Sequence, residues 1–308
     1  MKHWKTKLSI ILACQLLVAA GLWALGLQNS THQAVQLLAN LQEDNIQTIE
    51  IRSQDDSVKI ISENGVWKLP DFHSLKADQD KVKNLILELK GLTALDQVTQ
   101  SSSSHDRFEV SQEKANTELI LSGHNSVVLA HLFLGKSPSF GKRYVRMDGE
   151  DEIYSTKWNA MGLQAQGKSW FDQSVLQPSS ISELKFEEFT LTQENGLWKS
   201  GEISLDQDKA KKLTALLENL RVFDTSENEP ADGFDVEVRD SNGNSLTYTF
   251  FKKDKLNFVK RSDIDTTFQL SASTLDQLQE ASVEDLIKTD QESATPAEEP
   301  TPEPERKD

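Results

Sequence analysis

The sequence predicts an α+β protein built as two repeated antiparallel-sheet-plus-helix modules after one N-terminal transmembrane helix. Three observations predict it: an uncharged apolar segment near the N-terminus, short alternating apolar segments separated by turn residues, and a pair of sequence blocks that occurs twice. The 308 residues are enough for two globular units and such an anchor.

The apolar segment covers residues 8–27 (LSIILACQLLVAAGLWALGL) and carries no charge. At ~1.5 Å per residue, a helix of this length spans the ~30 Å hydrocarbon core of a bilayer. Basic residues precede it, at Lys2, Lys5 and Lys7, and the positive-inside rule then keeps the short N-terminus in the cytoplasm. We therefore expect a single-pass protein of the inner (cell) membrane that contacts lipid through residues 8–27, with its C-terminal bulk in the periplasm.

Two other export signals also fit this segment. Ala24-Leu25-Gly26 would suit the cleavage site of a signal peptide, and Cys14 after Ile11-Leu12-Ala13 would suit a lipoprotein signal. A retained helix is favoured because the apolar run is longer than the usual signal-peptide core and continues well past Cys14. In all three cases the globular part lies outside the cytoplasm.

Two sequence blocks occur twice in the same order, which is the signature of an internal repeat. Residues 63–68 (ENGVWK) recur as 194–199 (ENGLWK), and residues 78–83 (DQDKVK) recur as 206–211 (DQDKAK). We therefore divide the chain into four parts: a cytoplasmic stub and transmembrane anchor (1–30), a first α+β repeat (31–172), a second α+β repeat (173–288) and a disordered, acidic, proline-rich tail (289–308).

Each repeat begins with a predicted β-hairpin. Alternation of apolar and polar residues predicts half-buried strands over residues 46–52, 57–62, 181–186 and 189–193. Asn64-Gly65 and Asn195-Gly196 suit type I′ turns, because both central positions of such a turn require positive φ. Trp67 and Trp198 then begin the return strands, where we expect them to anchor the core.

A helix and further strands follow each hairpin. Asp78 and Asp206 are predicted to cap the two helices. Apolar residues at helical spacing are Val82, Leu85, Ile86, Leu89 and Leu92 in the first helix and Ala210, Leu213, Leu217 and Leu220 in the second. The later strands are predicted at 117–121, 127–134, 143–147, 152–155, 234–239, 245–251, 257–260 and 267–270. Short helices over 157–163 and 273–280 close the copies, and Trp170 and Phe171 predict that the linker 167–180 is packed.

Charge and cysteine content exclude several classes of function. The net charge is −16, and without Lys2, Lys5 and Lys7 the rest of the chain carries 30 basic and 49 acidic residues. Such a surface repels nucleic acid, so we expect no nucleic-acid partner. Cys14 is the only cysteine and lies in the apolar segment, so the globular part has neither a disulfide nor a cysteine-based metal site.

No constellation of residues in the sequence indicates catalysis. Gly135-Lys136-Ser137 resembles the end of a phosphate-binding loop, but position 130 is Ala130 where that motif needs glycine. The histidines at positions 73, 105, 124 and 131 are isolated in the pattern and show no metal-ligand spacing. We therefore expect no catalytic, cofactor-binding or metal-binding residues, no cofactor and no enzymatic activity.

The pattern resembles the bacterial "domain of unknown function 4340" family over roughly residues 1–288. The features that carry the resemblance are the N-terminal anchor and Trp67, Ala77-Asp78, Leu134-Gly135-Lys136, Tyr144-Val145, Ile153-Tyr154 and Trp170-Phe171-Asp172. The second copy keeps Trp198 but has Phe251-Lys252-Lys253 in place of the Leu-Gly-Lys motif. The resemblance implies no established activity, and it implies association with an ABC-type transport system of the gliding-motility kind, as a candidate auxiliary protein.

These observations predict a non-enzymatic envelope protein that acts as an auxiliary or scaffold subunit of a membrane (ABC-type) transport complex and therefore has a membrane protein as its partner. Two alternatives remain open. The first is an exported ligand-binding module, and the second is a hydrolase that uses only carboxylates, since the exported part has no other candidate groups.

Overall fold

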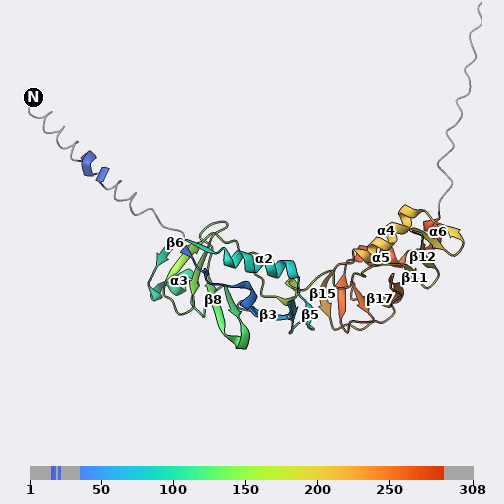
Figure 1. Cartoon of the computed structure of the whole chain (residues 1–308), viewed down its shortest axis with the longest axis horizontal. Helices are drawn as coiled ribbons and strands as arrows, with labels where there is room; N and C mark the ends of the chain where they lie inside the picture. Colours follow the sequence, from blue (N-terminus) through green and yellow to red (C-terminus); the bar gives the residue numbers. More distant parts are fainter. Residues whose placement is uncertain (1–14, 19, 22–34, 288–308) are drawn as a thin grey trace, which may run out of the picture. The chain divides into compact units, whose positions relative to one another are not determined.

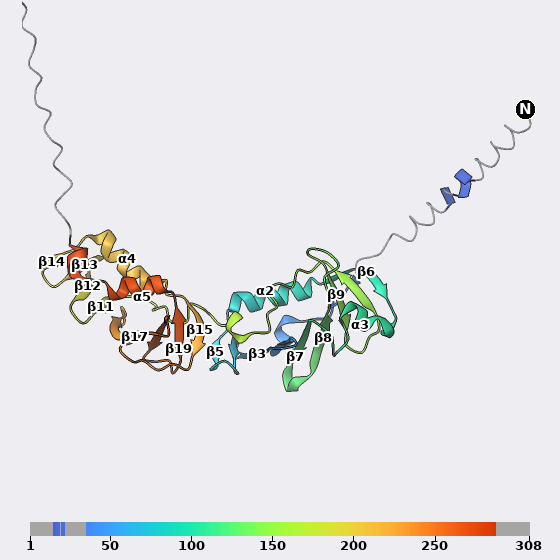
Figure 2. The same cartoon turned by 180° about the vertical axis from the view of Figure 1, so that it is seen from behind.

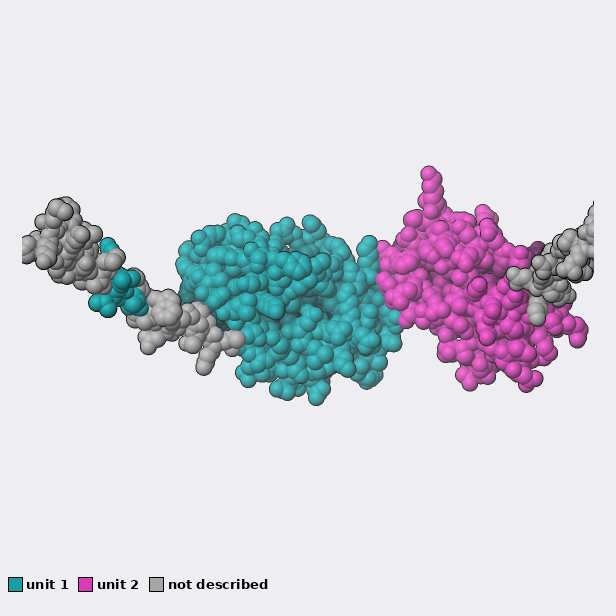
Figure 3. All heavy atoms as spheres, turned by 90° about the horizontal axis from the view of Figure 1, so that it is seen from above, with its two compact units in different colours: residues 1–172 teal, residues 173–308 magenta. Residues whose placement is uncertain are grey.

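The computed structural model describes residues 15–18, 20–21 and 35–287. The chain divides into two compact units, residues 1–172 and 173–308, which Figure 3 shows in separate colours. The predicted tail at 289–308 lies outside the described residues. Most of the predicted span 8–27 also lies outside them, and no helix in the described part of the chain is long and apolar enough to cross a membrane.

The first unit contains a sheet of ten strands in the order β1-β6-β10-β9-β8-β7-β2-β3-β4-β5. Its strands are β1 (Val35–Gln36), β2 (Thr48–Arg52), β3 (Ser57–Glu63), β4 (Val66–Leu69), β5 (Leu75–Lys76), β6 (Thr93–Thr99), β7 (Thr117–Ser122), β8 (Val128–Leu134), β9 (Arg143–Met147) and β10 (Ile153–Thr156). Its α-helices are α2 (Gln79–Lys90) and α3 (His105–Phe108). Both Figure 1 and Figure 2 show α2 lying along this sheet.

The second unit contains a sheet of nine strands in the order β14-β13-β12-β11-β16-β17-β18-β19-β15. Its strands are β11 (Glu183–Lys185), β12 (Thr190–Glu194), β13 (Leu197–Ser200), β14 (Ile203–Ser204), β15 (Val222–Ser226), β16 (Phe234–Arg239), β17 (Ser245–Lys253), β18 (Leu256–Arg261) and β19 (Thr267–Leu270). Its helices are α4 (Gln207–Glu218), α5 (Ala272–Gln279) and α6 (Val283–Leu286).

The predicted fold class is wrong. The described residues form two sheets of ten and nine strands, all paired antiparallel, with few helices, so the protein is mainly β and is not a helix-plus-sheet repeat. The alternation pattern missed β6 and β15, which lie at or next to sheet edges and so need little apolar character. It also missed the two-residue strands β1, β5 and β14. The two sheets nevertheless have the same strand order. The nine strands from β6 to β5 in the first sheet correspond one by one to the nine strands from β15 to β14 in the second.

Another error concerns residues 157–163, where a short helix was predicted. The structure has turns and irregular backbone there, and Ala160 has φ of 47°, which ends any right-handed helix. The side chains of Trp158 and Leu163 are buried all the same. The burial of these two apolar residues therefore does not depend on a helix.

The local predictions around the duplicated blocks are confirmed. Asn64 and Gly65 have φ of 53° and 80°, and Asn195 and Gly196 have φ of 49° and 79°, as a type I′ turn requires. Asp78 caps α2 by accepting from the backbone N–H of Lys81 at 3.0 Å. The apolar residues that the two helices bury were all predicted: Val82, Leu85, Ile86, Leu89, Ala210, Leu213 and Leu217. Leu92 and Leu220, which were also predicted to lie in the helices, come just after their ends, and the buried Thr214 was not predicted. Trp198 is buried, whereas Trp67 is half-buried.

The sequence did not single out Gln79 and Gln207, which join each hairpin to its helix. The carboxamide of Gln207 accepts from the backbone N–H of Trp198 at 2.7 Å and donates to Trp198 O at 2.9 Å and Leu205 O at 3.1 Å. Gln79 makes the same three contacts with Trp67 and Ala77. Each glutamine thus binds backbone groups of the hairpin and of the residue just before the helix cap.

Asp206, the cap of α4, makes this helix sensitive to acid. The backbone N–H groups of Lys209 and Asp208 donate to its carboxylate at 3.2 and 3.0 Å, and these hydrogen bonds hold the pKa of Asp206 below its ordinary value of 3.8. Because the folded pKa is the lower one, the stabilisation is present above the unfolded pKa and is lost as pH falls through the folded pKa.

We expect Asp206→Asn, which keeps a capping oxygen without the charge, to be less stable than the wild type near neutral pH. The difference should disappear once the pH lies below the folded pKa of Asp206. Urea unfolding of both proteins across this pH range measures the difference in the free energy of unfolding. A difference that does not change with pH would contradict the role given to the charge.

Candidate binding groove

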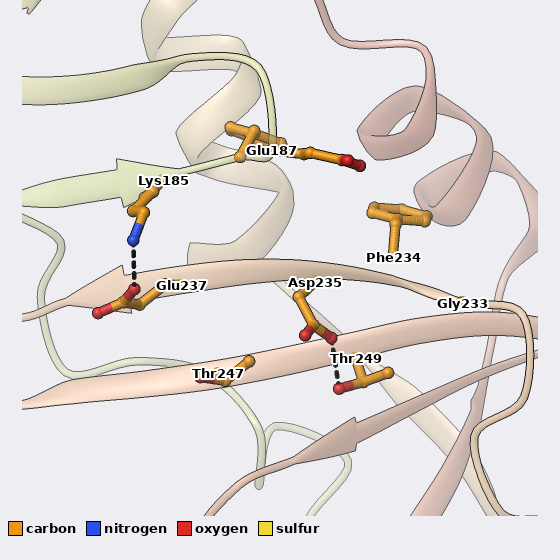
Figure 4. Close-up of a pocket in the computed structure, with 9 residues that line it drawn as sticks. Lys185, Glu187, Gly233, Phe234, Asp235, Glu237, Thr247 and Thr249 are labelled. Carbon is orange, nitrogen blue, oxygen red and sulfur yellow. Dashed lines mark hydrogen bonds and ion pairs between the residues drawn. The ribbon is translucent and has the colours of Figure 1, made fainter.

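A groove with a volume of 590 Å³ lies on the second unit (Figure 4). Its lining residues come from β11, β16, β17 and the loops beside them: Lys185, Phe186, Glu187, Gly233, Phe234, Asp235, Glu237, Thr247 and Thr249. All of them lie in the described part of the chain. None is a histidine, serine or cysteine, so the groove lining lacks the usual nucleophile-and-base pair.

Strand pairing forms the floor of the groove. Lys185 of β11 lies opposite Glu237 of β16, which in turn lies opposite Thr247 of β17. Asp235 lies opposite Thr249 in the same way. Because side chains alternate along a strand, Asp235 and Glu237 share one face of the sheet, while Val236 and Val238 between and after them are buried on the other.

Two of the three groove carboxylates have a partner. Lys185 Nζ lies 3.3 Å from Glu237 Oε2, and Thr249 Oγ1 donates to Asp235 Oδ1 at 2.7 Å (Figure 4). The carboxylate of Glu187 makes no hydrogen bond or ion pair with any described residue, and Figure 4 shows it directed away from Lys185. With one lysine against three carboxylates, the groove attracts cationic groups.

Aromatic rings form one end of the groove. An adjoining cavity of 260 Å³ shares Phe186, Glu187, Phe234 and Asp235 with it and adds Glu188 and Phe189. The rings of Phe186 and Phe189 stack with their centroids 4.5 Å apart, and Phe234 stacks on Phe250 at 5.4 Å. Stacked rings beside carboxylates can hold the aliphatic stem and the cationic head of one side chain at the same time.

The first unit has a cavity of 390 Å³ beside α2, lined in part by Lys81, Trp158 and Trp170. Three of its polar side chains already bond within the protein. Trp158 Nε1 donates to Glu88 at 3.0 Å, Trp170 Nε1 donates to Gln164 O at 2.6 Å, and Lys81 Nζ donates to Ser169 O. Burial lowers the pKa of the Lys81 ammonium, which lies 4.5 Å over the Trp170 ring. Through Lys81, these contacts link α2 to Ser169 and Trp170. Trp170 and Phe171 are buried, as predicted.

The residues that the sequence raised as candidates for chemistry are scattered. His131 lies 2.7 Å from Glu118 and 3.2 Å from Asp148, His105 lies near Asp151, and His124 is in the turn between β7 and β8. No group of His, Cys, Asp and Glu in the described ranges could hold a metal ion. Residues 135–137 follow β8, and the N–H of Lys136 donates to Phe108 O at 3.3 Å.

Gly135 is required by packing. A Cβ atom at this position would lie 2.1 Å from Phe108 O and 2.9 Å from Glu109 O, which are both backbone atoms. Its N–H also donates to Tyr144 O at 2.9 Å. The Leu-Gly-Lys motif therefore reflects the close approach of β8 to the turn after α3.

Comparison with protein families gives one match: the model described as "Domain of unknown function (DUF4340)" covers residues 67–300. The chain belongs to this family. A search of curated proteins and a search of solved structures each found no match. The DUF4340 match includes Gly135, both glutamines and the whole groove, and its description assigns no activity.

The sequence did not identify the groove, although it predicted the strands that build it. Residues 234–239 and 245–251 were predicted as strands, and their alternation already separates Asp235 and Glu237 from the buried valines. What the alternation could not show is that β11, some 50 residues earlier in the chain, pairs with β16 and brings Lys185 and Phe186 beside them.

Proposed function

We propose that this DUF4340 protein is a non-enzymatic envelope protein, anchored through residues 8–27, that acts as an auxiliary or scaffold subunit of a membrane (ABC-type) transport complex. Its partner is a membrane protein that presents an extended basic segment to the groove of the second unit. The observation that supports this most is the combination of stacked phenylalanines with an unengaged carboxylate, Glu187, in an open groove.

The chemistry of the groove favours a peptide with cationic side chains. Lys or Arg can place its ammonium or guanidinium group near Glu187 and Asp235 while its methylene groups lie on the half-buried Phe234. The groove is open to solvent and its floor is a sheet face, which suits a segment of chain that passes across it. Charge attraction of this kind mainly raises the rate of association and makes the protein more selective for its partner.

A photo-crosslinking amino acid at Thr249, in the full-length protein in cells, tests the proposal. We expect it to capture a subunit of a membrane transport complex, whereas the same group at Lys211, exposed on α4, should not. Glu187→Arg should reduce the Thr249 adduct severalfold, because it reverses the free charge of the groove. Glu218→Arg, a charge reversal on α4, is the matched control and should leave the adduct unchanged.

The outcomes separate the proposal from its nearest alternative. Equal adducts at Thr249 and Lys211, or an adduct that Glu187→Arg does not reduce, would contradict a role for the groove. The volume of 590 Å³ also lies within the ~300–1,000 Å³ range of small-molecule sites, so an exported ligand-binding module is the second candidate. A ligand that raises the melting temperature of the protein, with no protein adduct at Thr249, would favour it.

A further inference from the structure

The loop between β8 and β9 exposes an aromatic side chain to an unusual degree. Phe140 is 95% exposed, more than any other large hydrophobic residue in the described part of the chain. The loop reads GKSPSFGK from Gly135 to Lys142. A phenylalanine side chain that stays in solvent does not stabilise the fold, so the exposure of Phe140 requires another explanation.

Hydrogen bonds hold Phe140 in this exposed position. The N–H of Lys142 donates to Ser139 O at 3.0 Å, which closes a turn with Phe140 and Gly141 in the middle. Gly141 has φ of 71°, the conformation that a type II turn needs at that position. Ser137 Oγ lies 2.6 Å from both Ser139 O and Lys142 O and supports the same turn from inside. Phe140 is thus presented by an ordered loop.

Cations surround this apolar tip. Lys136 and Lys142 flank the loop, and neither forms an ion pair with any residue in the described ranges. Thr156, the last residue of β10, lies opposite Arg143, the first residue of β9, so Lys157 leaves the sheet at the same end as the loop. Met161, which is 68% exposed, comes four residues later and lines the same cavity as Lys157. Two exposed apolar residues and three lysines therefore gather at one end of the first sheet.

Strand β1, at which the described range 35–287 begins, lies at this end as well. Val35 of β1 pairs with Ala94, Ala94 pairs with Thr156, and Thr156 pairs with Arg143. These four residues form a row across adjacent strands, so Val35 lies about 14 Å from Arg143 at ~4.8 Å per strand. The predicted span ends at residue 27, and residues 28–34 can reach at most about 25 Å. This tether would keep the lysine-bearing end of the sheet close to the bilayer.

We infer that the loop 136–142 is a second membrane contact, in which Phe140 enters the headgroup region of the bilayer that anchors the chain, while Lys136, Lys142 and Lys157 bind anionic lipid phosphates. Segments that lie at the membrane surface bury apolar side chains such as Phe at the headgroup boundary, and cations near it are attracted to anionic lipid. The chain as a whole is acidic, so the three lysines at this end of the sheet give it a local positive charge that favours its facing anionic lipid. The inference rests on the proposed membrane placement.

Depth measurement on the full-length protein tests the inference. In a Cys14→Ser background, Ser139→Cys carries an environment-sensitive fluorophore, and the protein is reconstituted into vesicles of roughly 70% zwitterionic and 30% anionic lipid. Quenchers attached to lipid near the headgroups should reduce the emission severalfold more at this position than at Glu150→Cys. Glu150 is exposed beyond the opposite end of β9 and is the matched control.

Four results would overturn parts of the inference separately. Equal quenching at the two positions, in protein that floats with the vesicles, would remove the loop contact and leave the membrane placement standing. Protein that does not float with the vesicles would instead remove the proposed membrane placement itself. If Phe140→Ser left the quenching at Ser139→Cys unchanged, Phe140 would be excluded as its cause. If the quenching were the same in vesicles without anionic lipid, the lysines would be excluded as its cause.

Discussion

Replacing Gly135 with alanine is expected to destabilise the first unit by at least about 2–3 kcal/mol, which corresponds to a fall in melting temperature of about 5–10 °C. The new Cβ would lie 2.1 Å from Phe108 O and 2.7 Å from a side-chain carbon of Val110. Phe108 ends α3, and Glu109 after it has φ of 60°, so the backbone there cannot move away without losing its turn. The strand β8 must shift instead, and it carries the buried side chains of Leu132, Phe133 and Leu134.

Gly162→Ala is the matched control, since nothing lies within 4 Å of a Cβ atom at that position. Calorimetry of the full-length protein can follow both variants, because a change confined to the first unit should move only one of two transitions. If both alanine variants melted like the wild type, the short distance between Gly135 and the backbone of Phe108 would not matter for stability. The Leu-Gly-Lys motif would then require a functional explanation instead.

Replacing Gln207 with glutamate is expected to destabilise the second unit by about 2–3 kcal/mol at neutral pH. The carboxamide donates to two backbone carbonyl oxygens, Trp198 O and Leu205 O. A carboxylate cannot donate, and it would place a negative charge against both oxygens. The hydrogen bond from the N–H of Trp198 would survive, so the expected loss comes from the contacts with the two carbonyl oxygens.

The glutamate variant should also show a pH dependence that the wild type lacks at this position. The carbonyl oxygens disfavour the charged form and so raise the folded pKa of the introduced carboxyl above its unfolded value of about 4.3. Stability is then highest below the unfolded pKa and is lost as pH rises through the folded pKa.

Urea unfolding followed by tryptophan fluorescence at several pH values measures this loss. Gln193→Glu, an exposed glutamine on the neighbouring strand β12, is the control and should show little change. A Gln207→Glu variant whose deficit relative to the control does not grow with pH would show that the two carbonyl contacts contribute little.

Local structure followed from the sequence wherever a few neighbouring residues decide it. Asn64-Gly65 and Asn195-Gly196 could be recognised as turns because few residues tolerate positive φ. Asp78 and Asp206 could be recognised as caps because a short acceptor side chain satisfies the free N–H groups of the first helical turn. The alternation of residues 143–147, 234–239 and 267–270 predicted three strands with their observed bounds.

Only the tertiary structure decided the fold class, the glutamine contacts and the groove. Strand β15 and the two-residue strands join a sheet through backbone hydrogen bonds, which leave almost no pattern in the side chains, so the extent of the sheets and the mainly-β class were hidden. The groove depends on the register between β11 and β16, which pairs Lys185 with Glu237 across 52 positions of the chain. By itself the sequence determined turns, caps and buried faces, because these arise within a few residues. Contacts between distant segments depend on which strands pair and in which register, and this pairing is visible only in the folded sheets.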